Sequence, residues 1–148
     1  MILVSACLLG INCKYNGDNN KNEQVEKYLK DKEFIVVCPE QLGGLSTPRD
    51  PSEIINLDKD DVINGNTNII SNKNLDVTKQ FKKGALETLK IANLYKCKEA
   101  ILKEGSPSCG SSFIYDGTFT GKKINGSGVT TTLLKQNGIK VISEKDII

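Results

Sequence analysis

The sequence predicts an α/β fold in which helices flank a parallel sheet of about four strands. Four short apolar runs lie along the chain, and segments with the apolar spacing of amphipathic helices alternate with them. This alternation is typical of parallel sheets whose strands are joined by right-handed helical crossovers. Since the 148 residues contain no repeat, low-complexity tract or linker, we expect a single domain over residues 1–148.

The predicted strands are continuous apolar runs, as expected when helices cover both faces of a sheet. The first run includes LVSAC, which is similar to a lipoprotein cleavage box. Because it starts directly after Met1, with no basic segment or long apolar region before it, we expect a buried strand there. The four strands are predicted at Ile2–Ala6, Phe34–Val37, Ala100–Leu102 and Ile139–Ile142.

Three segments have the spacing of amphipathic helices. The first is Glu23–Leu29. A longer helix is expected from a cap at Asp76–Thr78 to about Tyr95, and a third helix over Val129–Gln136. Gly138 stands where glycine commonly ends a helix.

The remaining segments contain turn signals. We expect a loop over Leu8–Gly17 and irregular structure from Cys38 to Pro51, which includes GGLSTPRDP. One hairpin is predicted to pair Ile54–Leu57 with Asn68–Ser71. A second, short hairpin is predicted within Phe113–Phe119, with Asp-Gly at its turn.

Composition excludes several classes of function. With 26% charged residues and a net charge of +2, the chain gives no strong case for binding nucleic acid or an acidic membrane. No apolar run approaches the ~20 residues of a membrane span. The absence of histidine excludes Cys/His zinc sites and histidine-based catalytic triads. Five cysteines in a lysine-rich chain do not indicate a disulfide framework, so we expect a cytoplasmic protein.

Three cysteines, Cys7, Cys38 and Cys109, each follow a short apolar run. Residues just past the carboxyl ends of parallel strands converge on one crevice, so these thiols are expected to meet there. A single cysteine is most often a small buried apolar residue, but that explanation weakens for three at one edge. Three converging thiolates indicate an iron–sulfur cluster with an incomplete ligand set, which leaves one iron free to bind a substrate.

The other two cysteines differ from these three. Cys97 lies between a helix end and a strand start, at the opposite edge of the sheet, and we expect it to be structural. Cys13 lies six residues after Cys7 and is a fourth ligand, a nearby redox thiol or a filler of space. The spacing matches no compact ferredoxin run, and the absence of CxxC argues against thioredoxin-type exchange.

Polar residues next to the thiols are candidates for proton transfer and for orienting a polar heterocycle. Glu40 follows Cys38 by two residues, and its position at a strand end favours a functional role. For the others the alternative is that the serines build the turn and that the charged pair is solvated. These other candidates are Lys103, Glu104, Ser106 and Ser108.

Two further features fit an anionic group on a ligand. Arg49 lies in a turn from which its guanidinium would fork an anion. Gly126, Ser127 and Gly128 precede a predicted helix N-terminus, where backbone amides would cradle a phosphate. The same GSG sequence is also a common helix cap.

Several long motifs occur in order over nearly the whole chain: SACLLG, CPEQLGGLSTPRDPSEI, AILKEGSPSCGSSFIYDGTF and GVTTTLL. Together they resemble the thiouracil desulfidases, a family of small bacterial domains. The resemblance implies a Rossmann-like three-layer fold and a 4Fe–4S cluster held only by Cys7, Cys38 and Cys109. It implies removal of sulfur from 4-thiouracil, 2-thiouracil or 4-thiouridine monophosphate, with Glu40 and Ser106 as catalytic residues.

The chain departs from the pattern of this family at two places. The first loop reads CKYNG where an Arg-Tyr-Asp-Gly type of sequence is expected, and it carries the additional thiol of Cys13. The third turn has Gly105 where a larger polar residue is usual. Two other functions stay open on the residues alone: an iron–sulfur or sulfide carrier, and a domain with a structural metal. Both a monomer and a homodimer are compatible with the sequence.

Overall fold

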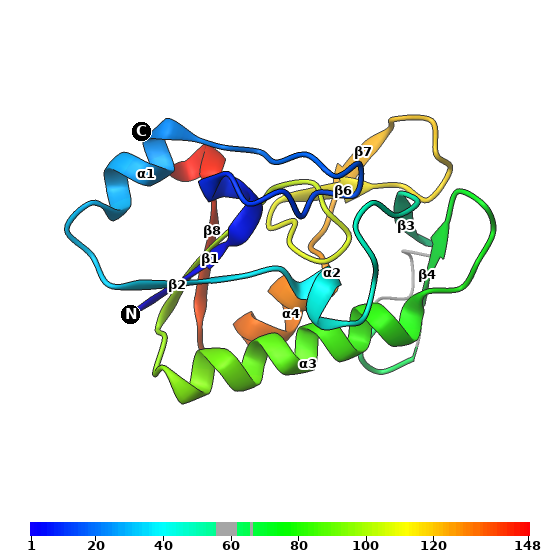
Figure 1. Cartoon of the computed structure of the whole chain (residues 1–148). Coiled ribbons are helices and arrows are strands. Elements are labelled where there is room, and N and C mark those ends of the chain that lie inside the picture. Colours follow the sequence, from blue (N-terminus) through cyan, green and yellow to red (C-terminus); the bar gives the residue numbers. More distant parts are fainter. Residues whose placement is uncertain (56–61, 66) are drawn as a thin grey trace.

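A four-stranded parallel sheet lies at the centre of the computed structural model, which describes residues 1–55, 62–65 and 67–148. The strands are β1 (Ile2–Ser5), β2 (Phe34–Val37), β5 (Glu99–Leu102) and β8 (Lys140–Ser143). Their order is β2-β1-β5-β8, and every neighbouring pair is parallel (Figure 1). The predicted α/β fold with a parallel sheet of about four strands is therefore confirmed.

Helices cover both faces of the sheet. They are α1 (Glu23–Leu29), α3 (Thr78–Leu94), α4 (Val129–Gln136) and, at the ends of β1 and β8, the 3-10 helices η1 (Ala6–Leu9) and η3 (Glu144–Asp146). Val4 of the sheet packs in one buried cluster with Val25 of α1. Leu3, on the opposite face, packs with Ala92 of α3 and Leu134 of α4. The alternation of side chains along β1 thus produces three layers.

The edge strand β2 is less buried than its apolar sequence predicts. Phe34 is 42% exposed and Val36 is 41% exposed, because β2 is at the end of the sheet order and α1 packs against β1 and β5. The expectation of a strand covered on both faces was wrong here.

The segment after β2 begins with a short helix, α2 (Pro39–Leu42), where irregular structure was expected. Cys38 is its N-cap residue and Pro39 occupies the first turn. Proline favours this position because its fixed φ suits a helix start and its missing N–H is not needed there.

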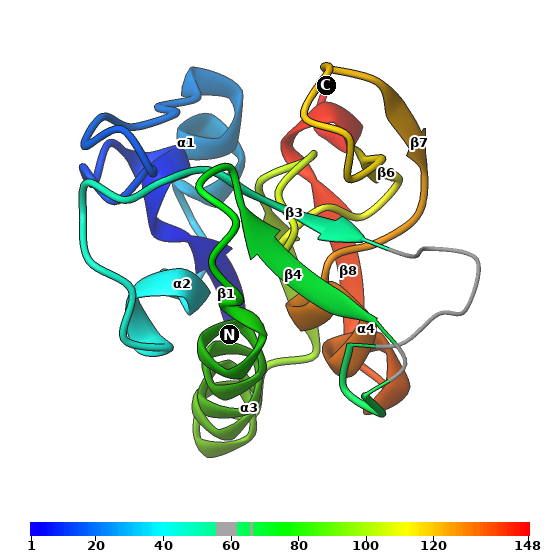
Figure 2. The same ribbon diagram turned by 90° about the vertical axis from the view of Figure 1, so that its right-hand side faces the viewer.

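Two antiparallel hairpins lie beyond the carboxyl ends of the central strands (Figures 1 and 2). The first pairs β3 (Ser52–Ile55) with β4 (Asn68–Ser71), as predicted, although part of the expected Ile54–Leu57 strand lies outside the described residues. The second pairs β6 (Phe113–Tyr115) with β7 (Lys123–Asn125). The prediction of a short hairpin ending at Phe119 was wrong, because the connection runs on to residue 122.

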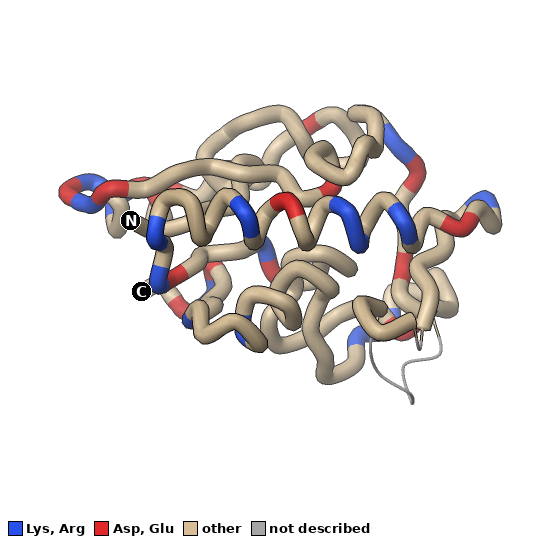
Figure 3. The backbone as a smooth tube through the Cα atoms, turned by 90° about the horizontal axis from the view of Figure 1, so that it is seen from below, with Lys and Arg blue, Asp and Glu red and all other residues tan. Residues whose placement is uncertain are grey.

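The long helix α3 is amphipathic. Its buried side carries Phe81, Ala85 and Ala92, whereas Lys83 and Lys90 are exposed. Figure 3 shows that Lys positions recur along this helix. None of the helices in the described part of the chain has the length and hydropathy that a membrane crossing requires.

Helices α2 and α3 approach closely where two glycines meet. A Cβ atom at Gly84 in α3 would overlap the carbonyl oxygen of Pro39. A Cβ atom at Gly43, which follows α2, would overlap the carbonyl oxygen of Gln80. The backbone of α2, which begins next to Cys38, therefore rests directly on the backbone of α3.

Candidate functional site

A pocket of about 430 Å³ opens at the carboxyl ends of the central strands. Cys7 lies in η1 after β1, Cys38 caps α2 after β2, and Cys109 lies in the turn after β5. All three line this pocket, so the structure brings these cysteines together as the strand ends predicted. Among the described residues, the β3–β4 and β6–β7 hairpins contribute the opposite walls through Glu53, Tyr115 and others.

Cys109 is the most deeply buried of these three thiols. The hydroxyl of Ser5 donates a hydrogen bond to its sulfur at 3.6 Å, and Ser108 Oγ lies 3.5 Å from the same sulfur. Burial raises the pKa of the Cys109 thiol to about 12. A positively charged metal centre would be needed to hold this sulfur as a thiolate near neutral pH.

Cys13 also lies at the pocket, in contact with two of the three thiols. Hydrogen bonding with the Cys13 thiol lowers the pKa of both Cys7 and Cys38 and brings that of Cys38 to about 7. The Cys38 thiol also lies 3.9 Å from the carbonyl oxygen of Cys13. The pKa of Cys13 itself is raised, because its proton is held between the two neighbouring sulfur atoms and the group is buried. The loop therefore adds a fourth sulfur to the site.

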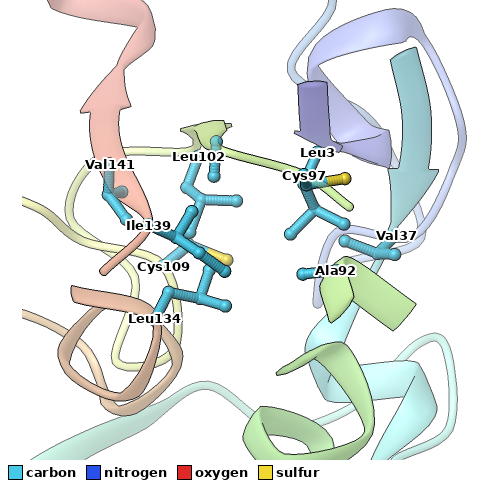
Figure 4. Packing of buried hydrophobic residues seen from close by; sticks show 10 residues of the cluster. Leu3, Val37, Ala92, Cys97, Leu102, Cys109, Leu134, Ile139 and Val141 are labelled. Carbon is cyan, nitrogen blue, oxygen red and sulfur yellow. The ribbon is translucent and has the colours of Figure 1, made fainter. Parts of the chain in front are cut away.

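Cys97 does not line the pocket, although it belongs to the same buried cluster as Cys109. It is buried in the apolar cluster between the sheet and helices α3 and α4, near Leu3 and Ala92 (Figure 4). Burial raises the pKa of its thiol. This position agrees with the structural role predicted for Cys97.

The three pocket thiols fit a cluster better than a single metal ion. A single ion requires its thiolates to converge within bonds of about 2.3 Å. Among the described residues, no three Cys, Asp or Glu side chains converge in that way. In a 4Fe–4S cluster each thiolate binds a different iron, so the ligands stand further apart around a larger group. The donor type and the shared pocket of Cys7, Cys38 and Cys109 fit such a group.

Glu40 extends from the first turn of α2 into the pocket. Its side chain is 19% exposed, and burial raises the pKa of its carboxyl, against the opposing effect of Arg49 at 3.5 Å. The hydroxyl of Ser108 donates a hydrogen bond to Glu40 Oε2 at 3.4 Å. A carboxylate whose proton affinity is raised in this way suits a general base.

The two serines of the third turn continue from Glu40. Ser108 Oγ lies 2.8 Å from Ser106 Oγ, and Ser106 lines the pocket. Ser106 Oγ also accepts hydrogen bonds from the backbone N–H groups of Ser108 and Cys109, at 3.0 Å and 3.1 Å. Ser106 therefore stabilises the turn and, at the same time, ends a line of oxygen atoms that starts at Glu40.

Arg49 lines the pocket, but its guanidinium forms hydrogen bonds with other groups of the protein. Its side chain is 7% exposed, and its Nη2 donates to the carbonyl oxygen of Cys13 at 2.8 Å. Its Nη1 donates to the hydroxyl of Thr47 at 3.0 Å. The guanidinium that was expected to fork a ligand anion thus joins the Cys13 loop to Glu40.

Lys103 and Glu104 are both held by the protein. Lys103 forms an ion pair with Glu144 at 3.0 Å and donates to the carbonyl oxygen of Glu104. Glu104 is only 4% exposed, so the alternative of a solvated carboxylate was wrong. Its oxygens accept hydrogen bonds from the N–H groups of Gly105, Ser111, Ser112 and Phe113 and from the hydroxyl of Ser111. Although burial alone would raise the pKa of Glu104, these bonds lower it to about 2.

The structure does not bring Gly126, Ser127 and Gly128 to the pocket. The N–H of Gly128 donates to the carbonyl oxygen of Gly110, and the next two amides of α4 donate to those of Pro107 and Ser108. A Cβ atom at Gly128 would overlap the backbone of Ser108. The start of α4 thus caps the third turn instead of presenting free amides.

Sequence reasoning missed an aromatic part of the pocket. Tyr15, Tyr115 and Phe119 line it, together with the charged residues Lys14 and Glu53. The signal was present in the motifs CKYNG and YDGTF, where an aromatic residue stands two positions from the glycine of a turn.

Comparison with known proteins identifies the family. Residues 2–146 match the family described as 2-thiouracil desulfurase. The Bacillus subtilis (strain 168) protein YbbK, described as uncharacterized, is 52% identical over 147 residues, which cover 99% of this chain and 97% of YbbK. The solved structure of the [4Fe-4S]-dependent thiouracil desulfidase TudS has a TM-score of 0.85 and 38% identity, over 99% of this chain and 91% of that one. This chain therefore belongs to the 2-thiouracil desulfurase family.

Proposed function

We propose that this protein removes sulfur from thiolated uracil compounds with the help of a 4Fe–4S cluster bound by Cys7, Cys38 and Cys109. The observation that carries the proposal is the meeting of these three thiols with Glu40 in one pocket. Family membership and the likeness to TudS support the same reaction class. Free thiols and an oxygen-sensitive cluster suit the reducing cytoplasm.

The cluster, when bound, supplies an iron with an open position that acts as a Lewis acid toward the soft thiocarbonyl sulfur. The protein supplies the proton chemistry. Glu40 accepts a proton from the water whose oxygen adds to the ring carbon, and the carbon–sulfur bond then breaks. Sulfur leaves as hydrosulfide and the ring keeps the water oxygen, so no electrons are gained or lost.

Ser108 and Ser106 complete the path for the proton. Ser108 is hydrogen-bonded to Glu40, and Ser106, 2.8 Å from Ser108, faces the pocket. Ser106 orients the heterocycle or passes a proton between it and Glu40. Arg49 holds Glu40 and the Cys13 loop in position rather than binding the substrate.

The proposed substrates are 4-thiouracil, 2-thiouracil and 4-thiouridine monophosphate. These share one planar ring and one thiocarbonyl group. The test is anaerobic reconstitution, followed by analysis of iron and sulfide and by an assay of hydrosulfide release from each compound. We expect about four irons per chain, as the cluster type requires, and catalytic release of hydrosulfide.

A matched pair of variants ties the activity to the thiols. Cys38→Ala should lose both the cluster and the activity, whereas Cys97→Ala should keep the cluster because Cys97 does not line the pocket. Full iron content in Cys38→Ala would disprove the ligand assignment. A stable cluster without hydrosulfide release from any of the three compounds would favour a carrier of sulfide or iron–sulfur units.

A further inference from the structure

The aromatic wall of the pocket contains one residue with an unusual backbone. Phe119 lines the pocket from the β6–β7 connection and is 38% exposed. Its φ is +58°, in the left-handed region that a residue with a Cβ atom rarely adopts. The neighbouring Gly117 and Gly121 also have positive φ, so the connection already contains residues that adopt this conformation without strain. A bulky aromatic residue at position 119 therefore calls for a reason.

Glu53 holds Phe119 in this conformation. Its Oε1 accepts hydrogen bonds from the N–H groups of Gly117 and Phe119, at 3.0 Å and 3.3 Å. Glu53 belongs to β3, so the bond joins the two hairpins between two residues that line the pocket. Backbone strain that the surroundings maintain in this way is characteristic of ligand clamps.

The second aromatic residue of the same hairpin is held by packing. Tyr115, at the end of β6, meets Phe113 edge to face, with ring centroids 6.5 Å apart and planes at 88°. The Nζ atom of Lys123 in β7 lies over the ring of Phe113, 4.6 Å from its centroid. Tyr115 and Phe119 thus extend from a fixed support into the pocket that contains the thiols.

We propose that Phe119, held by Glu53, is a stacking platform for the pyrimidine ring of the substrate. This inference rests on the proposed function and specifies how the same pocket binds its ring. Stacking on an aromatic side chain tolerates different substituents, because it uses the flat face that all uracils share. The platform would bind the base, the nucleotide and the oxygenated product alike. Which ring carbon loses its sulfur would depend on the side of the pocket that contains the thiols.

The first test separates stacking from simple filling of space. Phe119→Leu keeps an apolar side chain without a ring, and it should raise the KM for 4-thiouracil about 5- to 150-fold with little change in kcat. Phe119→Trp should recover the low KM. The matched control is Phe34→Leu, since Phe34 is similarly exposed but lies on the edge strand β2, away from the pocket. A KM for Phe119→Leu within twofold of the wild-type value would overturn the proposal.

The second test measures binding without turnover. The chain contains no tryptophan, so the fluorescence of reconstituted Phe119→Trp reports on this position alone. Uracil should quench it, and dihydrouracil, which has the same polar groups on a saturated ring, should not. If the wild type releases no hydrosulfide, the proposed function fails while quenching by uracil would still support the platform. Absence of quenching at saturating uracil would overturn the platform whatever the activity.

The role of Glu53 is tested by non-additivity. Glu53→Ala should raise the KM in the same direction as Phe119→Leu, because it releases the connection that holds the ring. Since both act through one contact, the double variant should be no worse than the weaker-binding single variant. Multiplicative effects would show that Glu53 does not act through Phe119.

Discussion

Glu40 and Glu104 line the same pocket, and their surroundings differ mainly in hydrogen-bond donors. In the described part of the chain, Glu40 has two partners, the hydroxyl of Ser108 and the guanidinium of Arg49, and burial raises its pKa. Glu104 accepts bonds from four backbone N–H groups and a hydroxyl, and its pKa falls to about 2. A carboxylate with few donors has affinity for a proton, whereas one saturated with donors does not. The comparison supports the proposed general-base role of Glu40 and indicates a structural role for Glu104.

The largest effect is expected from Glu40→Gln. An amide of nearly the same shape cannot take a proton from water, so hydrosulfide release should fall about 10²- to 10⁴-fold. Iron content should stay at the wild-type level, because Glu40 is not a proposed ligand. Anaerobic turnover assays with iron analysis on the same sample would measure both. Near-normal turnover would contradict the general-base role proposed for Glu40, and with it the functional difference between Glu40 and Glu104.

Glu104→Gln should instead reduce stability. The amide nitrogen of glutamine would face N–H donors that now bind a carboxylate, and a pKa lowered from 4.5 to about 2 corresponds to stabilisation on the order of 3 kcal/mol. Urea unfolding of the reconstituted protein at neutral pH would measure the difference. Unchanged stability would show that the turn does not depend on this charge.

The same carboxylate predicts how stability depends on pH. Because the pKa of Glu104 is lower in the folded state, its contribution is complete above about pH 4.5 and is lost as the pH falls toward 2. The stability difference between the wild type and Glu104→Gln should therefore narrow over this range. A difference that stays constant between pH 5 and pH 3 would contradict the cause assigned to it.

Ser106→Ala should have a smaller effect on the rate. Loss of one hydroxyl contact to the ring corresponds to about a tenfold decrease, the equivalent of one hydrogen bond. A loss as large as that of Glu40→Gln would instead make the Glu40–Ser108–Ser106 line a proton path. Comparison of the two variants under one set of assay conditions distinguishes these roles.

The smallest effect is expected from Cys13→Ser. Although Cys13 contacts Cys7 and Cys38, three thiolates suffice for the proposed cluster, and a fourth ligand would block the iron that the reaction needs. Iron content after reconstitution should stay close to that of the wild type. Loss of the cluster in this variant would favour a closed ligand set and electron transfer.

Local patterns in the sequence were sufficient for much of the fold. The bounds of α1, β2 and α4 were predicted to the residue, because apolar spacing and the Gly138 stop signal act over a few neighbours. The meeting of Cys7, Cys38 and Cys109 followed from their shared position at strand ends. The resemblance of the motifs to the family then indicated the nature of the group that we propose they bind.

Features that depend on distant segments could not be predicted in this way. The sequence left open whether Glu104 is functional or solvated, because its N–H donors in Ser111–Phe113 reach it only when the chain folds back around it. The strand Lys123–Asn125 is short and largely exposed, so its sequence carries no alternation strong enough to indicate a partner. The amides at Gly128 were expected to be free, because nothing nearby in sequence shows that the third turn accepts their hydrogen bonds.

The glycine contact between α2 and α3 has a consequence for how variants of this protein would be interpreted. In Gly84→Ala the added methyl group would overlap the carbonyl group of Pro39 and push α2 away from α3. Cys38 and Glu40, which stand at the start of α2, would move with it. Such a variant would show low iron content after reconstitution. The cause would be the steric overlap between α2 and α3 and not the loss of a proposed ligand. The distance between the thiols is therefore set partly from outside the pocket, by how near two backbones can come.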